Sequence, residues 1–365
     1  MIRGVGIVGM GLWDGPVVEN DAFGADFLDR AQVKDPYHGR RGDDGAVRIA
    51  GMEFVPGRHD RTLAAIERSF ADPYRGTRRR RWLAPEQRVS DAETEAASRA
   101  MADAGIGPKD VGALLVQSFL PDQLNPKNSA LVAHNLGVTA GPVWEVDSVC
   151  NSSLSQMMAG ASLIASGEAR HVVCVQSVAY SRVRDPGASA SVQEGDMASA
   201  FVLGPVPGAE MAFSWRTDGS LHSAISLQWS APSGAPGRRY WERSDERLLI
   251  RFDHELQQRV NREVAEHAVV TSTEALARAE MRLADVELFA THQPMSWYGA
   301  FMDDVLGLAD GVSCSSFEEY ANVNSASLPA SLHDARRAGR LQRGSRVLLF
   351  CPAAGYTYGA VAMRW

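Results

Sequence analysis

An internal repeat restricts the possible folds of this chain more than any other feature of its sequence. Residues 109–121 (KDVGALLVQSFLP) and 284–294 (ADVELFATHQP) each follow a long helical segment, contain Asp-Val near their start, run through an apolar stretch and end in a polar loop with proline. Each copy then continues with a short helical stretch that closes in Leu-Gly, another strand, a polar loop, a helix and an apolar strand. This order predicts an α/β fold in which helical crossovers join parallel strands, with a pseudo-twofold axis relating two sheets.

The repeat divides the chain into two halves, residues 1–205 and 206–365, and we expect function where they meet. Residues 20–88 interrupt the pattern, because they are polar, rich in arginine and glycine, and weakly periodic. We interpret them as an inserted or peripheral segment. The run Arg78–Arg81 has two open interpretations. It could bind the phosphates of a coenzyme or an acidic carrier protein, or it could be a solvated basic edge without a binding role.

A single cysteine lies in the stretch VDSVCNSSL, residues 146–154, between a predicted strand and a predicted helix. The strand is expected over residues 143–149, which are rich in β-branched and aromatic side chains. The helix is expected over residues 154–165, where apolar residues recur at helical spacing. Cys150 therefore lies where unpaired backbone N–H groups and the positive end of the helix dipole favour thiolate over thiol. The alternative is a small buried hydrophobic residue, which is the usual role of a free cysteine.

The corresponding loops of the second half carry two more side chains of chemical interest. His292 and Asn322 both follow strand-like segments, and functional groups in parallel α/β sheets gather at the carboxyl ends of the strands. A histidine can move a proton near pH 7, and an asparagine can donate a hydrogen bond to a developing oxyanion without titrating. Taken alone, His292 could be a structural histidine and Asn322 could be a turn or cap residue. Their joint occurrence with Cys150 at corresponding positions makes the three a candidate site.

Two further local patterns have structural interpretations. The N-terminal GVGIVG fits G-x-G-x-x-G, but only three residues precede it and no amphipathic helix follows it. A glycine-rich strand packed close to a neighbour is therefore favoured over a dinucleotide site. In residues 90–105, Ser90 followed by Glu93 is typical of a capping box at a helix start, and Gly105 marks the helix end.

Composition limits the partners and the compartment. A net charge of −7 and a pI of about 5.8 argue against nucleic acid as the main partner, because neutralising phosphates requires a basic surface. The four cysteines show neither C-x-x-C pairing nor metal-ligand spacing, so we expect no metal site, no disulfide framework and a reducing compartment. The N-terminus resembles no signal peptide, and its apolar run is too short to span a bilayer. We therefore expect a cytoplasmic protein without a membrane partner.

Several motifs, taken in their order along the chain, resemble one family. They are VDSVCNSSL, GDMASAFVL (195–203), THQPMSWYGAFMDDVLGL (291–308), YANVNSASLPASLHDARRAGRLQRGSRVLLF (320–350) and the terminal PAAGYTYGAVAMRW. The combined set is highly specific and resembles β-ketoacyl-acyl carrier protein synthase III, of the thiolase superfamily. The resemblance covers residues 89–205 and 255–365, and residues 20–88 match little.

The resemblance implies a thiolase-like, five-layered αβαβα fold, a homodimer and a catalytic triad of Cys150, His292 and Asn322. It also implies that Cys150 accepts an acyl group from acyl-coenzyme A or an acyl-carrier protein, whose phosphopantetheine thioester is a substrate and not a permanently bound cofactor. The backbone N–H groups of Cys150 and Ala354 would form the oxyanion hole. His292 and Asn322 would then donate to the carbonyl of a malonyl-type thioester as carbon dioxide leaves, in a decarboxylative Claisen condensation.

Departures from the family pattern predict a specialised relative, such as one from polyketide-type metabolism. Residues 353–355 read Ala-Ala-Gly where three glycines are usual. Met295 and Trp297 occupy positions where the family commonly has an asparagine and an arginine, which predicts a larger and more apolar pocket mouth. Together with Asn151, beside the nucleophile, these two residues are the candidates for the substrate pocket.

Other functions are compatible with the same fold. The main alternative is ketosynthase III-like acyl transfer to a hydroxyl or amine acceptor without formation of a carbon–carbon bond. Asn322 favours condensation, because acyl-transferring relatives often carry an acidic residue there. The retained triad disfavours a non-catalytic partner subunit. A thiol hydrolase or protease is disfavoured because its local signatures are missing, and no G-x-S-x-G nucleophile elbow occurs.

Overall fold

A computed structural model describes residues 1–24, 27, 41–183, 189–229 and 248–365, so residues 25–26 and 28–40 of the predicted insertion lie outside the described residues. The centre of the described molecule is one mixed sheet of eight strands. The order across this sheet is β12-β13-β14-β9-β8-β6-β7, and β1 pairs with β9. The strands are β1 (Ile2–Leu12), β6 (Ala113–Ser118), β7 (Val143–Glu145), β8 (Val172–Ala179), β9 (Asp196–Thr217), β12 (Leu288–Thr291), β13 (Arg346–Ala353) and β14 (Thr357–Arg364).

The two parts of this sheet repeat one pairing pattern. β6 runs parallel to β8 and β8 antiparallel to β9, just as β12 runs parallel to β13 and β13 antiparallel to β14. β9 belongs to both parts, because residues 196–203 pair with β8 and residues 210–217 pair with β14. Its partner changes around the segment GPVPG, residues 204–208, where proline cannot donate a ladder hydrogen bond. One long strand therefore joins the two sheets that the repeat predicts, and residues 205 and 206 lie within the changeover.

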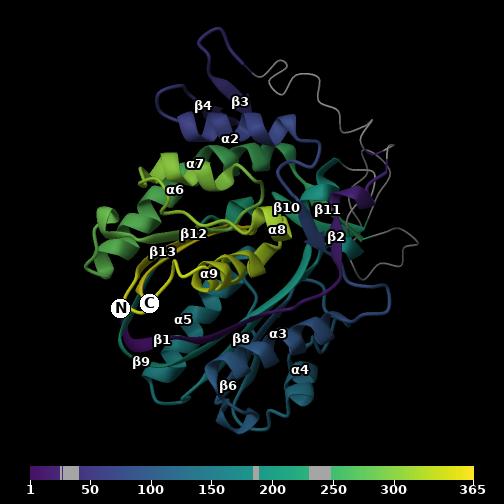
Figure 1. The fold of residues 1–365 in the computed structure, drawn as a ribbon, viewed down its shortest axis with the longest axis vertical. Helices are drawn as coiled ribbons and strands as arrows, with labels where there is room; N and C mark the ends of the chain where they lie inside the picture. Colours follow the sequence, from purple (N-terminus) through teal and green to yellow (C-terminus); the bar gives the residue numbers. More distant parts are fainter. Residues whose placement is uncertain (25–26, 28–40, 184–188, 230–247) are drawn as a thin grey trace.

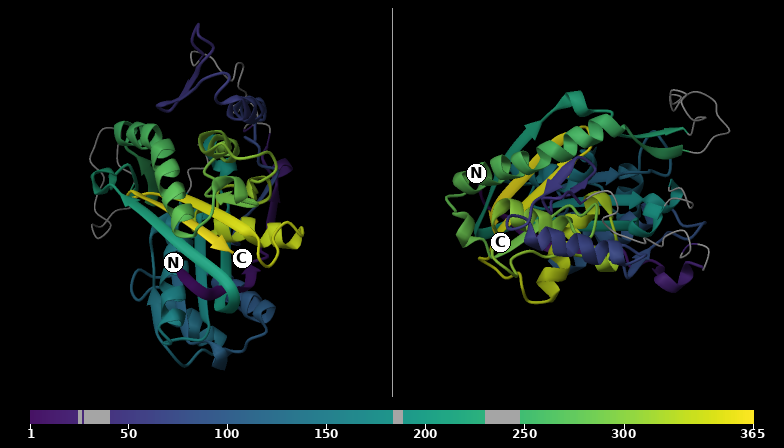
Figure 2. Two further views of the ribbon diagram at one scale, coloured as in Figure 1. Left: turned by 90° about the vertical axis from the view of Figure 1, so that its left-hand side faces the viewer. Right: turned by 90° about the horizontal axis from the view of Figure 1, so that it is seen from above.

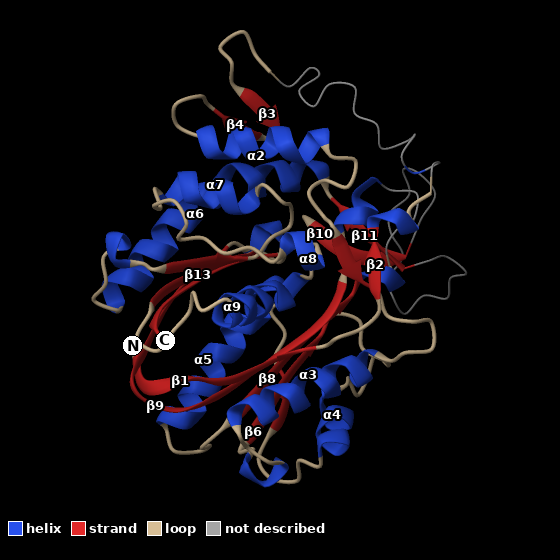
Figure 3. Ribbon diagram, in the orientation of Figure 1, coloured by secondary structure: helices blue, strands red, loops and turns tan. Residues whose placement is uncertain are grey.

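Helices and sheet stack in five layers (Figures 1 and 3). α3 and α4 cover one outer face, α6 and α7 cover the other, and α5 and α9 lie between the two parts of the sheet. In Figure 2 the long teal strand β9 runs beside the yellow strands of the C-terminal half. The predicted αβαβα fold is confirmed. In the described part of the chain, none of the helices combines the length and apolar character needed to cross a bilayer. The elements outside the central sheet are α3 (Val89–Ala104), α4 (Ser129–Leu136), α5 (Ser152–Ala165), α6 (His254–Arg278), α7 (Tyr298–Leu306), α8 (Phe317–Tyr320), α9 (Ser327–Arg337) and the paired strands β10 (Ile225–Trp229) and β11 (Leu248–Phe252).

The glycine-rich N-terminus forms β1, and its glycines let α3 approach the sheet closely. A Cβ at Gly9 would lie 2.3 Å from the carbonyl oxygen of Ala100, and one at Gly11 would lie 2.4 Å from that of Ala96. No side chain fits at these distances, so close packing requires glycine at both positions. The interpretation of GVGIVG as part of a packed strand is therefore confirmed.

Within the segment 20–88, residues 47–71 form a small layer over α7 (Figure 1). The Nε of Arg61, on α2, donates to Asp304 Oδ1, on α7, at 2.8 Å. The fully buried Phe54 packs edge-on against Trp297, with ring centroids 5.5 Å apart. The segment is peripheral, as predicted, but buried contacts attach it to the C-terminal half. Its elements, with the short strand that precedes it, are β2 (Val17–Glu19), β3 (Val47–Ile49), β4 (Met52–Phe54), α2 (Asp60–Ala71) and β5 (Arg79–Arg81).

The arginine run Arg78–Arg81 makes contacts within the chain. Arg78 and Arg79 both form ion pairs with Glu319, on α8. Arg80 is fully buried. These contacts favour a structural role, in which the run holds the insertion against α8, over the binding of coenzyme phosphates.

Helix α3 ends at Gly105 with a φ of 67°, as predicted, but the predicted capping box is wrong. Glu93 is fully buried and faces the strands instead of the helix start. Its Oε1 accepts hydrogen bonds from the hydroxyls of Ser118 at 2.5 Å and Ser177 at 2.6 Å, and its Oε2 accepts one from Asn128 Nδ2 at 2.9 Å. Burial outweighs these hydrogen bonds and raises the pKa of Glu93 from 4.5 to about 7.

Replacing Glu93 with glutamine is expected to remove a pH-dependent loss of stability. The folded protein holds a proton on Glu93 up to about pH 7, whereas the unfolded chain releases it near pH 4.5. Wild-type stability should therefore fall as the pH rises through this window and stay lower above it. Relative to Glu93→Gln, the free energy of unfolding of the wild type, measured by urea titration, should fall by about 3 kcal/mol across the window. A difference between the two proteins that does not vary with pH would contradict this assignment.

Candidate active site

Cys150 lies on a sharp turn at the start of α5. The predicted strand before it is shorter than expected, because β7 ends at Glu145. Cys150 is instead the middle residue of a 3-10 turn, Val149–Asn151, that leads into α5. Val149 has a φ of 52°, which is unfavourable for a β-branched residue. The hydroxyl of Ser152 donates to the Val149 carbonyl at 2.6 Å and helps to hold this turn.

The second half of the chain builds the same kind of turn. The 3-10 turn Asn324–Ala326 leads into α9, and Asn324 has a φ of 51°. Ser325 therefore occupies, in the second half, the position that Cys150 occupies in the first. The two turns contact one another, so the nucleophile candidate of one half lies against the corresponding turn of the other.

Strand β13 brings Cys150 and His292 to the same end of the sheet. The main-chain N–H of His292, which follows β12, donates to the carbonyl oxygen of Phe350 at 3.3 Å. At the next residue of β13, the Sγ–H of Cys351 donates to the main-chain oxygen of Cys150 at 3.2 Å. Adjacent residues of one strand therefore anchor the thiol-bearing turn and the histidine.

Asn324 links His292 and Asn322. Its main-chain N–H donates to Asn322 Oδ1 at 3.0 Å, and its carbonyl oxygen interacts with the His292 ring. The main chain of Asn322 is held by Gln193, whose carbonyl accepts its N–H at 2.8 Å. Within the described ranges no acceptor binds the Asn322 Nδ2 group, so this amide is an available hydrogen-bond donor.

The pKa values of both titratable groups keep them neutral at pH 7. Cys150 as a whole is half-buried. Burial of its thiol raises the pKa of that group to about 12, although a hydrogen bond from the Ala354 main chain acts in the opposite direction. Burial lowers the pKa of His292 to about 4, and the Asn324 carbonyl offsets only part of this effect. The expectation that the helix dipole holds a thiolate is therefore wrong, because loss of hydration outweighs the dipole. The resting site contains a neutral thiol and a neutral imidazole.

Ala354 and Asn151 both lie beside the thiol but have different roles. The main-chain N–H of Ala354 interacts with the sulfur of Cys150, a placement that suits a donor to an oxyanion formed at this sulfur. Asn151 is fully buried, and its Nδ2 donates to the carbonyl and hydroxyl oxygens of Thr357 at 3.2 and 3.1 Å. Its side chain therefore ties the turn to β14, which is a structural role and not that of a pocket wall.

Trp297 lies in the core and not at a pocket mouth. It is 2% exposed and packs edge-on against Phe54 of the insertion and Phe301 of α7, with centroid distances of 5.5 and 6.3 Å. Met295 is half-buried and packs against the same apolar cluster. The apolar mouth predicted from Trp297 is therefore not formed by this residue, because the insertion covers its ring.

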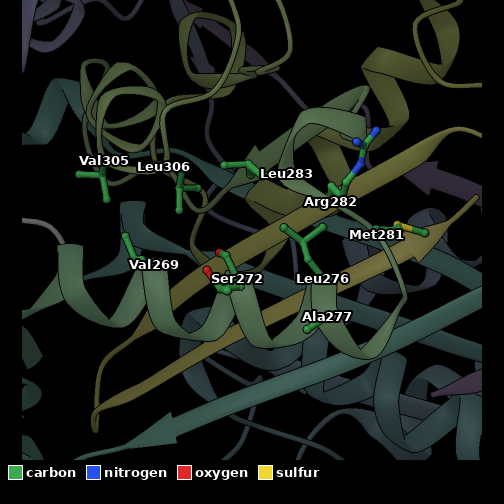
Figure 4. A pocket seen from close by; sticks show the side chains of 10 residues that line it. Val269, Ser272, Leu276, Ala277, Met281, Arg282, Leu283, Val305 and Leu306 are labelled. Carbon is green, nitrogen blue, oxygen red and sulfur yellow. The ribbon is translucent and has the colours of Figure 1, made fainter.

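Two cavities lie apart from Cys150, His292 and Asn322. One, of about 290 Å³, lies between α6 and α7 and has Val269 and Leu306 in its wall (Figure 4). The other, of about 460 Å³, lies between the insertion and Ser296. Neither wall includes a member of the predicted triad. The candidate site is therefore defined by the chemistry at the strand ends and not by either cavity.

Sequence reasoning does not single out three buried tyrosines whose pKa values respond to charge at Cys150. Tyr180 follows β8, Tyr298 is the first residue of α7, and Tyr356 follows β13. Burial raises the pKa of each phenol, and negative charge at Cys150 raises it further. The positions of Tyr180 and Tyr356 after strands were a usable signal, but a tyrosine has no motif that separates a site residue from a core residue.

Comparisons with known proteins place this chain in one group. The family model for the C-terminal part of 3-oxoacyl-[acyl-carrier-protein] synthase III matches residues 276–365, and that for the thiolase N-terminal domain matches residues 81–200. Beta-ketoacyl-[acyl-carrier-protein] synthase III 3 of Streptomyces coelicolor is 33% identical over 288 residues, which are 78% of this chain and 85% of the relative. The synthase III of Nitratidesulfovibrio vulgaris is 30% identical over 298 residues, 80% of this chain and 88% of the relative.

Solved structures share the fold at lower sequence identity. The 3-oxoacyl-[acyl-carrier-protein] synthase III of Aquifex aeolicus has a TM-score of 0.75 at 20% identity, over 99% of this chain and 100% of that chain. A variant of Xanthomonas campestris OleA has a TM-score of 0.73 at 20% identity, over 100% of this chain and 97% of that chain.

The fold and these matches make the chain a member of the thiolase superfamily. The sequence identity to the Streptomyces relative, and the share of both chains that the match covers, narrow this class from the superfamily to one family. The chain belongs to the β-ketoacyl-[acyl-carrier-protein] synthase III family, and it is an acyltransferase of the ketosynthase type.

Proposed function

We propose that this enzyme transfers an acyl group from a thioester to Cys150 and then condenses it with a malonyl-type thioester, with loss of carbon dioxide. The observation that carries the proposal is the anchoring of Cys150 and His292 to adjacent residues of β13, with Asn322 linked to His292 through Asn324. A thiol, an imidazole and a carboxamide thereby share one end of the sheet, where α/β enzymes place their chemistry.

In the first half-reaction, His292 accepts the thiol proton as the sulfur of Cys150 attacks the thioester carbonyl carbon. His292 can accept this proton because it remains neutral down to about pH 4. The main-chain N–H groups of Cys150 and Ala354 stabilise the oxyanion of the tetrahedral intermediate. The intermediate collapses to the acyl-enzyme, and the leaving thiolate takes the proton back from His292.

In the second half-reaction, the carboxylate of the malonyl-type thioester leaves as carbon dioxide, and its electron pair forms an enolate. The Nδ2 group of Asn322 donates a hydrogen bond to the enolate oxygen, where negative charge develops. Neutral His292 donates a second one in the tautomer that directs its single ring N–H at this oxygen. The enolate carbon attacks the acyl carbon on Cys150, and the sulfur leaves as a thiolate as the new carbon–carbon bond forms. The thiolate then takes a proton from water, which restores the neutral thiol. The product is a β-ketoacyl thioester.

The substrate carriers and the metabolic role extend this proposal. The names of the relatives include an acyl-carrier protein, and we assign acyl-coenzyme A or an acyl-carrier protein as the donor for this chain. The phosphopantetheine arm then enters as substrate, and no permanently bound cofactor takes part. Ala353 and Ala354, where the family usually has glycine, and the insertion that covers Trp297 support a specialised role of the polyketide type.

An acylation and decarboxylation assay tests this function. Purified enzyme is incubated with a series of acyl-coenzyme A thioesters, followed by malonyl-coenzyme A, while intact mass and carbon dioxide release are recorded. The expected result is an acyl adduct on the peptide that contains Cys150, followed by release of carbon dioxide and a β-ketoacyl product. Transfer of the acyl group to an alcohol or amine without carbon dioxide would establish the alternative acyltransferase instead. Absence of any acyl adduct would refute both functions.

The edge of the central sheet supports the homodimer that the family resemblance implies. β7 is the last strand in the sheet order, so one of its edges has no strand partner in the described part of the chain. Trp144 on this strand is 46% exposed, and the nearby loop residue Leu124 is 71% exposed. An unpaired edge with exposed apolar side chains is a template for pairing with a second chain. We therefore propose that two copies pair through β7.

Replacing Trp144 with arginine is expected to convert the dimer into monomers, because a charge would be buried at the pairing edge. Sedimentation velocity should show a species of twice 39.5 kDa for the wild type and one of 39.5 kDa for the variant. Val269, which is 41% exposed on the outer helix α6, provides the control Val269→Arg, which should remain dimeric. A monomeric wild type, or a dimeric Trp144→Arg, would contradict pairing through β7.

A further inference from the structure

The carboxamide of Asn322 is held in one orientation by its neighbour Asn324. The main-chain N–H of Asn324 donates to Asn322 Oδ1 at 3.0 Å. An N–H group can pair only with the oxygen of a carboxamide, so this hydrogen bond also decides where the nitrogen of Asn322 lies. Asn322 is half-buried, and its Nδ2 group faces away from this N–H, in an orientation that allows donation to a ligand.

The main chain of Asn324 is left-handed, and its side chain is bound at both ends. Its φ of 51° lies in a region that asparagine tolerates better than most residues. The main-chain N–H of Ser325 donates to Asn324 Oδ1 at 2.7 Å, which directs the Nδ2 group to the other side. There Nδ2 donates to the hydroxyl of Tyr180 at 2.9 Å. The buried carboxamide of Asn324 therefore connects the turn to Tyr180.

Tyr180 is a fixed point in the first half of the chain. It begins the 3-10 turn Tyr180–Arg182, directly after β8, and is 7% exposed. Its ring packs edge-on against Phe119, with centroids 5.4 Å apart, and shares an apolar cluster with Val323. A hydrogen bond to a ring that is already held in place adds little entropy cost, so it restricts Asn324 effectively.

We propose that Tyr180 is a positioning residue for the condensation step, because its hydroxyl, acting through Asn324, sets the orientation of the Asn322 amide. The inference rests on the proposed function and adds a residue that acts through Asn324 and not on the substrate. Stabilisation of an oxyanion requires a donor already in the correct place, so a loosened amide loses much of its effect. His292 depends less on this link, since its main-chain N–H is held separately by Phe350.

Replacing Tyr180 with phenylalanine tests the inference, because this change removes the hydroxyl and leaves the ring. Enzyme preloaded with the acyl group that acylates Cys150 fastest is mixed with a range of malonyl-coenzyme A concentrations, and carbon dioxide release is recorded. The maximal rate should fall about tenfold, the worth of one hydrogen bond. The malonyl-coenzyme A concentration that gives half of this rate, and the rate of acylation of Cys150, should stay at their wild-type values.

Replacing Asn324 with glycine breaks the same link from its other side. Glycine adopts a φ of 51° without strain and keeps the N–H that binds Asn322 Oδ1, but it lacks the carboxamide that binds Tyr180. Carbon dioxide release should fall at least as far as in Tyr180→Phe. Combining the two substitutions should lower it no further than Asn324→Gly alone, because both remove one contact.

A second double variant separates positioning from a general effect on the fold. Asn322→Asp lacks the amide whose orientation Tyr180 sets, so adding Tyr180→Phe to it should cause no further loss of carbon dioxide release. A merely structural role would give losses that multiply. Tyr358→Phe is the matched control, since it removes a buried hydroxyl that has no hydrogen-bond partner in the described ranges. This control should release carbon dioxide as the wild type does.

The outcomes separate this inference from the proposed function. Wild-type carbon dioxide release by Tyr180→Phe, together with a large loss in Asn322→Asp, would overturn the inference and leave the proposed function intact. Losses that multiply when Tyr180→Phe is added to Asn322→Asp, or slower acylation of Cys150 by Tyr180→Phe, would also overturn it. If Asn322→Asp releases carbon dioxide at the wild-type rate, the proposed role of Asn322 fails, and the inference fails with it.

Discussion

Replacing Cys150 with alanine is expected to abolish the acyl-enzyme and to lower the rate of acyl transfer by about four orders of magnitude or more. The variant lacks the sulfur that forms the thioester. The neighbouring thiol of Cys351 cannot substitute for it, because Cys351 is fully buried and its Sγ–H is directed at the main-chain oxygen of residue 150. Intact mass after incubation with acyl-coenzyme A, followed by peptide mapping, measures the effect.

Cys314 provides a control with the same thiol chemistry in another place. Burial raises its pKa to about 12, the value that burial also gives Cys150. It lies in the core with 8% exposure, and its main-chain N–H donates to Phe289 at 2.9 Å. Cys314→Ala should form the acyl-enzyme as the wild type does. Accumulation of an acyl-enzyme by Cys150→Ala would refute the assignment of the nucleophile.

Replacing Asn322 with aspartate is expected to lower carbon dioxide release by about 100- to 1000-fold, the usual effect of losing one oxyanion donor. Aspartate keeps the oxygen that accepts the Asn324 N–H at 3.0 Å, so the local main chain should be preserved. It replaces the Nδ2 donor with an oxygen that cannot donate, and its negative charge repels the enolate. Release of carbon dioxide from malonyl-coenzyme A by the preformed acyl-enzyme is the measurement.

The first half-reaction is the internal control for this variant. In the proposed mechanism Asn322 takes part only in the second half-reaction, so the Asn322→Asp variant should still accumulate the acyl adduct on Cys150. Carbon dioxide release at the wild-type rate would show that the Asn322 amide does not stabilise the enolate. Loss of the acyl adduct as well would show that the residue acts earlier than proposed.

Much of the fold could be predicted from the sequence, because its signals are local and repeated. The two Asp-Val segments and the apolar strands after them predicted the paired strands of the two halves, which the sheet confirms in β6 with β8 and in β12 with β13. The close spacing of glycines in β1 predicted a strand packed against a neighbour, and Gly9 and Gly11 meet α3 as expected. The long strand β9 was not predicted, because the change of partner along it depends on strands far away in the chain.

The candidate site was only partly accessible to the same reasoning. Cys150, His292 and Asn322 were found from residue type, expected position after a strand and the family resemblance. The expected position is wrong for Asn322, which follows the short helix α8. Their electrostatics were not, because the helix start near Cys150 indicated a thiolate, whereas burial by both halves keeps the thiol protonated. Glu93 shows the same limit, since its spacing from Ser90 is typical of a cap but three donors from other elements hold it in the interior.

By itself, the sequence determined the repeat, the order of strands and helices within each half and the candidate reactive groups, since these depend on residues close together in the chain. Only the tertiary structure decided which of these side chains are buried and lose their hydration. Burial placed Trp297 under the insertion and set the protonation states of Cys150 and His292. The physical reason is that desolvation sums over every atom packed around a group, and most of those atoms belong to residues distant in the chain.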